Sequence, residues 1–378
     1  MPTRGKKRVQ IGGKRTCFDY ALLFIIIFLT LFGLVMLYSA SSYEASIKGL
    51  GATYYLKKQA LASSIGIAAM AVVTMIDYRV WKRFALAGYL ISIVLILLVL
   101  TPLGIEYNGA KRWIGVGSFS FQPAEFAKLA VIIFLAFVIS KIGAEGLSRF
   151  RNVVLLLLLA GVIAGLLAVV TSNLSSALIV FGIAFVMLFV ASPKVRYFLL
   201  MGAAGVGAVA AFIVFGDGFR MSRIQAWLDP EGSSLDTAYQ TLQGLYAIGS
   251  GGLTGKGLGN SVQKLGFVPE AQNDFIFTII CEELGLFGAV SVIVIFAFML
   301  FRFHAISKNA PDLFGSMLLV GILAHIAIQV VLNIAVVTNS IPNTGVTLPF
   351  ISYGGTSVVF LMIEMGLALS VSRQTWAR

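Results

Sequence analysis

An aspartate stands where a long polar segment of this chain gives way to an apolar one. Asp274 lies in the stretch KLGFVPEAQNDFIFTIICEELGLFG, residues 264–288, and Glu270 shortly precedes it. A carboxylate at the end of an apolar helix is costly unless it faces water, a partner or a substrate. Because a carboxylate within hydrogen-bonding reach of a hydroxyl can take its proton, Asp274 is a candidate general base. The same position is also typical of a helix N-cap, and the residues alone leave both interpretations open.

Two more carboxylates follow inside the apolar run. On a continuous helix that begins at Asp274, Glu282 would lie about 12 Å deeper and roughly 80° around the axis, with Glu283 on nearly the opposite side from Asp274. Position alone makes neither of them catalytic. We interpret Glu282 and Glu283 as partners in pairing between helices.

A second group of polar residues lies in GAKRWIGVGSFSFQPAEFAKL, residues 109–129. Glu125 and Lys128 stand at i and i+3, so one helix would carry both on one face and let them pair. Both are expensive in lipid, which predicts that they face the bundle interior or a wet cavity. An ion pair that only joins helices is the simpler alternative. The cations Lys111 and Arg112 could likewise be ordinary interfacial anchors.

The segment before Asp274 is rich in glycine and contains Gly255-Lys256. A phosphate-binding P-loop would need glycine at 250 and serine or threonine at 257, where the chain has Ser250 and Gly257. The motif is therefore rejected. We expect the glycines to allow a tight loop packed closely beside the apolar helix.

A third polar stretch, NSIPNTGVTLPFISYGGTS, covers residues 339–357. Its prolines and glycines break regular structure, and irregular backbone at membrane depth survives only when it is buried in protein or lines a cavity. This segment is therefore a candidate cavity wall or lid.

Composition determines the elements that must position these residues. The 378-residue chain is 58% hydrophobic and 12% charged, with a mean hydropathy of +0.94. Soluble domains are far less apolar, so we expect an all-α polytopic membrane protein. The net charge of +12 lies in short patches between apolar runs, which argues against nucleic-acid binding. Cys17, Cys281, His304 and His325 form no metal or disulfide pattern, and we expect His325 to be packed or hydrogen-bonded in a helix.

Ten apolar runs predict ten transmembrane helices. They lie near 19–41, 59–76, 84–101, 123–140, 152–171, 172–191, 198–216, 274–301, 314–337 and 355–372. The loops that this order assigns to the cytoplasm hold about twice as many Lys and Arg as the outer ones, which predicts cytoplasmic termini. The domains expected are a basic tail at 1–18, one transmembrane domain at 19–372 and a short tail at 373–378. Two long outer loops result, at 102–122 and 217–273, and the second has enough apolar residues for short amphipathic helices on the membrane.

Together, the three polar stretches resemble the SEDS family (shape, elongation, division and sporulation proteins), in the same order and with ten spans. The resemblance is greater to the FtsW branch than to the RodA branch, and the SpoVE branch also fits. It implies a peptidoglycan glycosyltransferase that polymerises lipid II outside the bacterial cytoplasmic membrane. The expected setting is the division septum, with a class B penicillin-binding protein and other divisome proteins as partners.

The resemblance also implies roles for individual residues. The essential aspartate of the family falls on Asp274, as general base for the 4-hydroxyl of the acceptor GlcNAc. Supporting or substrate-binding positions are Lys111, Arg112, Trp113, Gln122, Glu125, Lys128, Glu270, Ser352 and Tyr353. The cations among them could face the pyrophosphate leaving group, and a divalent cation, Mg²⁺ or Mn²⁺, is compatible but not required. One departure is Thr171-Ser172-Asn173, where the family pattern leads us to expect a Gln-Pro-Asp-like turn.

Two other functions fit parts of the sequence. A lipid II flippase would use intramembrane charges such as Glu125, Lys128, Glu282 and Glu364 as a translocation path. It should, however, be polar at both mouths, whereas the polar motifs here gather outside. A scaffold that only recruits partners explains neither Asp274 nor the Glu125/Lys128 pair.

Overall fold

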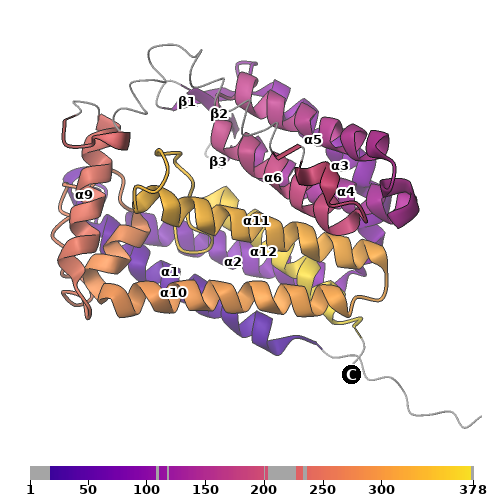
Figure 1. Ribbon diagram of the computed structural model, residues 1–378. Coiled ribbons are helices and arrows are strands. Elements are labelled where there is room, and N and C mark those ends of the chain that lie inside the picture. The colour runs from indigo at the N-terminus through magenta and orange to yellow at the C-terminus, as the bar shows by residue number, and fades with distance from the viewer. Residues whose placement is uncertain are drawn as a thin grey trace, which may run out of the picture.

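The computed structural model describes residues 18–107, 110–116, 119–199, 201–202, 227–232 and 236–375. Long α-helices dominate it (Figure 1). The helices are α1 (Tyr20–Ile47), α2 (Tyr54–Met75), the 3-10 helix η1 (Tyr78–Phe84), α3 (Ala85–Leu98), α4 (Pro123–Leu147), α5 (Phe150–Val170), α6 (Leu174–Ala191), α9 (Asp236–Gly251), α10 (Ile276–Lys308), α11 (Leu313–Val337) and α12 (Gly355–Ser372).

Within the described residues, nine helices are long and apolar enough to cross a membrane. They correspond to nine of the ten predicted spans. The remaining one, near 198–216, lies outside the described residues from 203 onwards. Most of the windows in α4, α11 and α12 are buried inside the protein, whereas α2 and α3 leave most of their apolar surface outward. Outward apolar surface is what lipid contact requires, so the structure is a bundle with α4, α11 and α12 at its centre.

The all-α prediction missed a small sheet between α3 and α4. The strands β1 (Gly104–Tyr107), β2 (Ala110–Val116) and β3 (Phe119–Phe121) pair antiparallel in that order. The register places Ile105 opposite Trp113 and Gly115 opposite Ser120. The sheet satisfies backbone groups that an irregular loop beside a membrane would leave open. The predicted loop at 102–122 is therefore folded.

The start of α10 differs from the prediction in a way that matters for Asp274. The helix begins at Ile276 with Phe275 as its N-cap, and no side chain caps it. The helix-cap interpretation of Asp274 is therefore wrong, since this residue lies in the turn before the helix. The helix is also interrupted at Gly285, whose φ of 66° is not helical.

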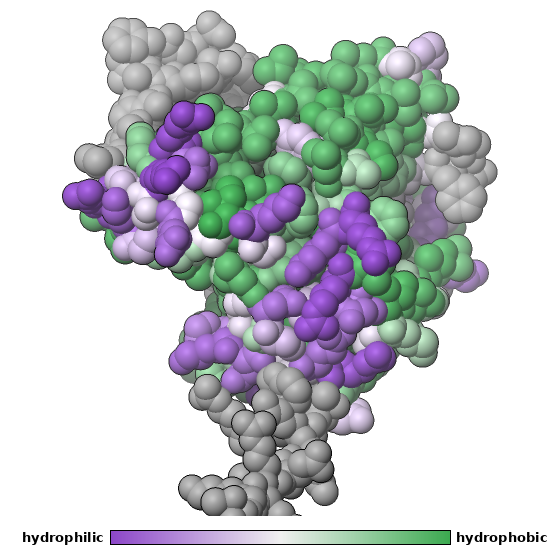
Figure 2. All heavy atoms as spheres, turned by 90° about the vertical axis from the view of Figure 1, so that its right-hand side faces the viewer, coloured by the Kyte–Doolittle hydropathy of each residue, from purple (hydrophilic) through white to green (hydrophobic). Residues whose placement is uncertain are grey.

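The two described ends of the chain meet at one end of the bundle, opposite the sheet and α9 (Figure 1). The Asp19 amide donates to Ser372 Oγ at 3.4 Å, and Arg302 Nη2 lies 2.6 Å from Asp19 Oδ2. Figure 2 looks at this end and shows hydrophilic side chains gathered across its middle and lower part. These two described ends therefore lie on one side of the bundle, and the cytoplasmic location of the termini stays a prediction.

Candidate active site

The main chain of Asp274 is tied to α11 by one buried asparagine. Asn333 Nδ2 donates to the Asp274 carbonyl oxygen and to the Val346 carbonyl oxygen, each at 2.7 Å. Asn333 is fully buried. Because one amide group holds both carbonyls, the turn before α10 and the loop between α11 and α12 are fixed next to each other.

The Asp274 carboxylate lies against that loop. A Cβ atom on Gly345 would be 3.7 Å from Asp274 Oδ2, and Gly345 has a φ of 67°, where side chains are rarely accommodated. The side chain of Asp274 is half-buried. The segment predicted as a cavity wall therefore does border the candidate base, through Gly345.

The surroundings of Asp274 favour its protonated form. Burial raises the pKa of the Asp274 carboxyl from 3.8 to about 6, the backbone amide of the same residue opposes the shift, and the negative charge of Glu270 adds to it. Among the residues that the structure describes, no cation lies within ion-pair distance of this carboxylate. A carboxyl with this pKa is mostly ionised at neutral pH and more basic than an ordinary aspartate.

Glu282 and Glu283 lie in quite different surroundings, because both are fully buried and paired. Glu282 Oε1 is 2.6 Å from Lys256 Nζ, and Glu283 Oε1 is 2.8 Å from Lys264 Nζ. Ser39 of α1 also donates to Glu283 at 2.6 Å. The expected pairing between helices is made by Ser39 and by Ser250 of α9, which donates to Glu282 at 3.3 Å, whereas both lysines come from the loop before α10. We call the two glutamates, the two lysines and the two serines the carboxylate cage.

A further hydroxyl and backbone amides also donate hydrogen bonds to the carboxylate cage. Ser261 Oγ and the amides of Val262 and Gln263 donate to Glu282, the amides at 3.1 and 3.2 Å. Paired and hydrogen-bonded charges of this kind fix structure. Neither glutamate is therefore available as a base.

The glycine-rich loop packs closely on the first turns of α10, as the sequence indicated. The Lys256 and Gly257 amides donate to the carbonyls of Glu282 and Glu283 at 3.0 and 2.9 Å. A Cβ on Gly255 would lie 2.2 Å from the Glu283 carbonyl oxygen, and one on Gly285 would lie 2.3 Å from the Gly255 nitrogen. Only glycine permits this approach of two backbones.

The predicted Glu125–Lys128 pair is present. Lys128 Nζ is 2.9 Å from Glu125 Oε1, and both side chains are buried. Ser357 of α12 donates to Glu125 at 3.1 Å. Pro123 at the first position of α4 starts the helix that carries them. The pair joins α4 to α12 in the centre of the bundle.

A second buried pair lies between α11 and α12. His325 Nδ1 is 2.9 Å from Glu364 Oε2, and both side chains are almost fully buried. The expectation that His325 is a hydrogen-bonded helix residue is confirmed.

The sheet places its cations at the turn between α5 and α6. Arg112 of β2 donates from Nη2 to the Ser172 carbonyl at 2.9 Å and from Nε to the Thr171 carbonyl at 3.3 Å. Lys111 beside it is exposed, and Trp113 is half-buried. Gln122 is the N-cap residue of α4 and makes no side-chain cap bond. Both of these Arg112 bonds reach the turn between α5 and α6, and neither reaches Asp274.

Ser352 and Tyr353 belong to the wall beside Asp274. The Ser352 hydroxyl accepts from the Leu348 amide at 2.8 Å, which closes a turn and leaves Ser352 buried. The Tyr353 amide donates to the Gln272 carbonyl at 2.9 Å, two residues before Asp274. Ser352 thus shapes the loop, and Tyr353 is linked directly to the segment that carries the candidate base.

Sequence reasoning missed Asn333 and Gln59. Gln59 of α2 donates to the Ser352 carbonyl at 3.2 Å and accepts from the Gly354 amide at 3.1 Å, so it holds Tyr353 from both sides. Both are amides in otherwise apolar helices, and a polar side chain inside a span is itself a signal of function or pairing. That signal was present in the sequence, although it does not identify the partners.

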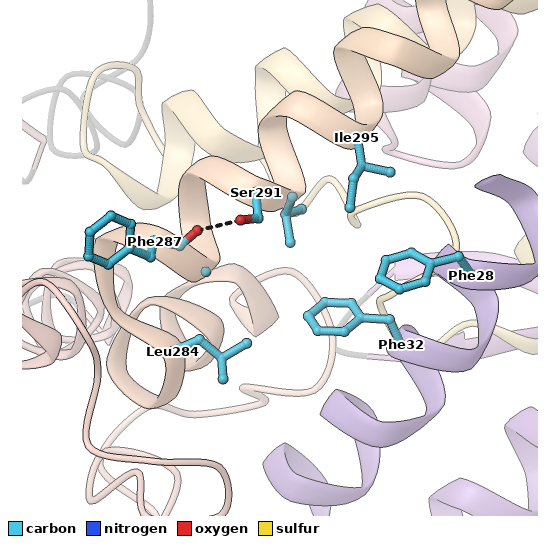
Figure 3. A pocket seen from close by; sticks show the side chains of 8 residues that line it. Phe28, Phe32, Leu284, Phe287, Ser291 and Ile295 are labelled. Carbon is cyan, nitrogen blue, oxygen red and sulfur yellow. Dashed lines mark hydrogen bonds between the residues drawn. The ribbon is translucent and has the colours of Figure 1, made fainter.

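An apolar groove of about 330 Å³ lies between α1 and α10 (Figure 3). Phe28 and Phe32 face Leu284, Phe287 and Ile295 across it. None of the described side chains that line it is titratable, so these residues supply no acid or base to the groove.

The described residues also contain no group of three His, Cys, Asp or Glu side chains that could hold a metal. No protein ligand for a divalent cation can be named from them.

A half-buried carboxylate that pairs with no cation among the described residues lies at one end of a bundle of apolar helices, so the structure is that of a polytopic membrane protein with a candidate base. The family model FTSW_RODA_SPOVE, described as "Cell cycle protein", matches residues 20–376, and the chain belongs to this family.

Relatives match along nearly the whole chain. Stage V sporulation protein E of Bacillus subtilis (strain 168) is 40% identical over 361 residues, 95% of this chain and 98% of the relative. A protein named probable peptidoglycan glycosyltransferase FtsW, from Geobacter sp. (strain M18), is 38% identical over 358 residues, 94% and 96% of the two chains. Sporulation and FtsW proteins are therefore both among the similar proteins.

Solved structures share the fold. A chain of a peptidoglycan synthase complex, solved to explain how polymerization and crosslinking are coordinated, superposes with a TM-score of 0.79 at 27% identity, over 94% of this chain and 98% of that chain. The rod shape determining protein RodA of Thermus thermophilus gives a TM-score of 0.70 at 27% identity, over 96% and 99%.

Proposed function

We propose that this protein is a peptidoglycan glycosyltransferase that polymerises lipid II into glycan strands. The family and the names of the relatives support the activity. The observation that carries the residue assignment is the state of Asp274, which is partly desolvated, lacks a described cation partner and has a raised pKa. Perturbed carboxyls of this kind are typical of catalytic sites.

In the proposed reaction, Asp274 takes the proton of the 4-hydroxyl on the acceptor GlcNAc. The oxygen attacks C1 of the donor MurNAc, and the bond from C1 to the lipid pyrophosphate breaks. A general base contributes about a hundredfold to ten-thousandfold when it lies within hydrogen-bonding reach. Asn333 positions the base by holding its main chain against the loop that carries Gly345.

The departing pyrophosphate needs positive charge. Lys111 and Arg112 are both exposed cations of the sheet, but Arg112 is bonded to the α5–α6 turn, and Lys128 is neutralised by Glu125. We therefore favour Lys111 over the other two as the counter-charge. The Mg²⁺ or Mn²⁺ that the resemblance allows is not assigned to any residue, and loss of polymerisation on chelation with EDTA would support it.

Lipid II transport without bond formation is the rival function. It would need charges along a path through the bundle. The Glu125–Lys128 pair is instead buried and neutralised internally, and the buried Glu364 is hydrogen-bonded to His325. Sealed pairs of this kind stabilise helix packing, so the geometry favours the enzyme.

The relatives support a setting for the reaction. A structural neighbour works in a synthase complex, which supports a class B penicillin-binding protein as partner. The FtsW names support a role at the division septum with other divisome proteins, in the cytoplasmic membrane. The sporulation relative supports use during spore formation as the alternative.

The test uses the purified protein together with its transpeptidase partner. Asp274→Asn should abolish glycan polymerisation from lipid II while the variant still folds and binds the partner. Glu282→Gln is the matched control, since it lies on the same segment but in the carboxylate cage. Undiminished polymerisation by Asp274→Asn would remove Asp274 as the base.

A further inference from the structure

Three tyrosines and a lysine form a surface cluster beside the candidate active site. The rings of Tyr55 and Tyr353 meet edge to face, with centroids 5.1 Å apart, and Tyr54 and Tyr55 do the same at 5.3 Å. Lys58 Nζ lies 4.5 Å from the centroid of the Tyr54 ring. Tyr54, Tyr55 and Lys58 come from the first turns of α2, and Tyr353 comes from the loop before α12. We call these four residues the tyrosine platform.

The tyrosine platform is joined to the segment that carries Asp274. Gln59 of α2 brackets Tyr353 through the Ser352 carbonyl and the Gly354 amide. The Tyr353 amide in turn bonds to the Gln272 carbonyl. Through this bond the platform is attached to the chain two residues before Asp274.

Tyrosines near the ends of membrane helices are commonly interfacial anchors, with their rings turned outward. Tyr20, Tyr38 and Tyr43 of α1 fit that description, since each is exposed. The platform tyrosines do not, because all three are only half-exposed and their rings contact one another. Their rings are thus ordered without being covered.

The charge of the platform is also unbalanced. Lys58 is exposed, and among the described residues it pairs with no carboxylate. The side chains that interact with its charge are those of Tyr54, Tyr55 and Tyr353. The neighbouring Lys48, in contrast, is paired with Glu44. Ordered aromatic faces suit the C–H face of a sugar ring, and an ammonium that pairs with no described carboxylate suits a phosphate.

We propose that the tyrosine platform is a binding subsite for lipid II, with a hexopyranose ring on Tyr55 and Tyr353 and the attached pyrophosphate facing Lys58. This inference rests on the proposed function and adds Tyr54, Tyr55 and Lys58 to the substrate-binding residues. The platform binds substrate in the ground state and in the transition state alike. Its loss therefore raises KM and leaves kcat nearly unchanged.

The experiment measures kcat and KM for lipid II in the complex with the transpeptidase partner. Tyr55→Leu and Lys58→Gln should each raise KM about fivefold or more, with kcat within about twofold of wild type. Tyr55→Phe keeps the ring and Lys58→Arg keeps the charge, so both should remain near wild type. Tyr43→Leu is the matched control, because it removes an exposed tyrosine near the end of α1 that precedes α2.

Lys58→Gln also protects the test against misfolding, because it changes an exposed side chain and leaves the core untouched. Wild-type KM in both Tyr55→Leu and Lys58→Gln, in complexes that polymerise lipid II, would overturn the platform and leave the proposed function intact. A loss confined to kcat would overturn it as well. If the wild-type complex did not polymerise lipid II at all, the proposed function would fail and the platform with it.

Discussion

Asp274 and Glu283 lie on one short segment of the chain, and their carboxylates are held in opposite ways. Glu283 is fully buried and receives hydrogen bonds from Lys264 and Ser39. Asp274 keeps some exposure and pairs with no described cation, so burial raises its pKa. A carboxylate with its partners in place holds the structure together, whereas one without them keeps its reactivity. Glu283 therefore helps to build the site, whereas Asp274 is the proposed base in it.

The largest expected effect is on activity, in Asp274→Asn. We expect polymerisation to fall at least about a hundredfold, because general-base catalysis is lost. The melting temperature at pH 8 should not fall, since the substitution removes a charge that burial disfavours. Thermal unfolding in detergent distinguishes a loss of catalysis from a loss of stability. A lower melting temperature that accounts for the lost activity would contradict the contrast between Asp274 and Glu283.

Glu283→Gln should lower stability and largely keep activity. It leaves the Lys264 ammonium buried without a counter-charge, which costs about 3–5 kcal/mol of stability. We expect a lowered melting temperature, with activity per folded molecule largely kept. The double variant Glu283→Leu with Lys264→Met is the control, and it should recover much of the loss because no unpaired charge remains. An unchanged melting temperature in Glu283→Gln would contradict a structural role for the cage.

Gly285→Ala should have a smaller effect of the same kind. The residue has a φ of 66°, and its Cβ would lie 2.5 Å from the Leu253 carbonyl oxygen. Strain of this type costs about 1–3 kcal/mol. Gly165→Ala in α5 is the matched control, because its Cβ would meet nothing within 4 Å and alanine is the better helix former. Equal melting temperatures for both variants would show that the close approach to the loop is unimportant.

The smallest effect concerns pH. Because Asp274 acts as a base only when ionised and its pKa is about 6, kcat/KM should rise about tenfold between pH 5 and pH 7. The contribution of Asp274 to the free energy of unfolding should instead fall as the pH rises. The raised pKa of the folded state contributes stability that is present below 3.8, the ordinary value, and is lost as pH rises through about 6. A rate profile that is flat across this range would contradict the assignment.

Local patterns in the sequence were enough to predict the described membrane-spanning helices and one ion pair. Apolar runs predicted the nine described spanning helices, because lipid contact demands long apolar segments. The i and i+3 spacing predicted the pairing of Glu125 with Lys128. The glycines before Asp274 indicated a close-packed loop, which Gly255 confirms.

Features that depend on distant segments could not be predicted. The lysines that neutralise Glu282 and Glu283 lie in a loop whose path the sequence does not define. The sheet was missed because β1 and β3 are too short to show a clear alternation. The cap interpretation of Asp274 failed because the aspartate sits one position before the N-cap, and helix boundaries are hard to place from sequence.

The break at Gly285 divides α10 into two parts with different attachments. The short part before it is bonded to the glycine loop through the carbonyls of Glu282 and Glu283, and the long part after it is bonded to the same loop at its start, where the Leu286 and Phe287 amides donate to the Gly252 and Leu253 carbonyls at 2.9 and 3.2 Å. The loop therefore holds α10 on both sides of the break. A partner helix that tilted the rest of α10 would bend it beyond Phe287 and leave the segment that carries Asp274 in place.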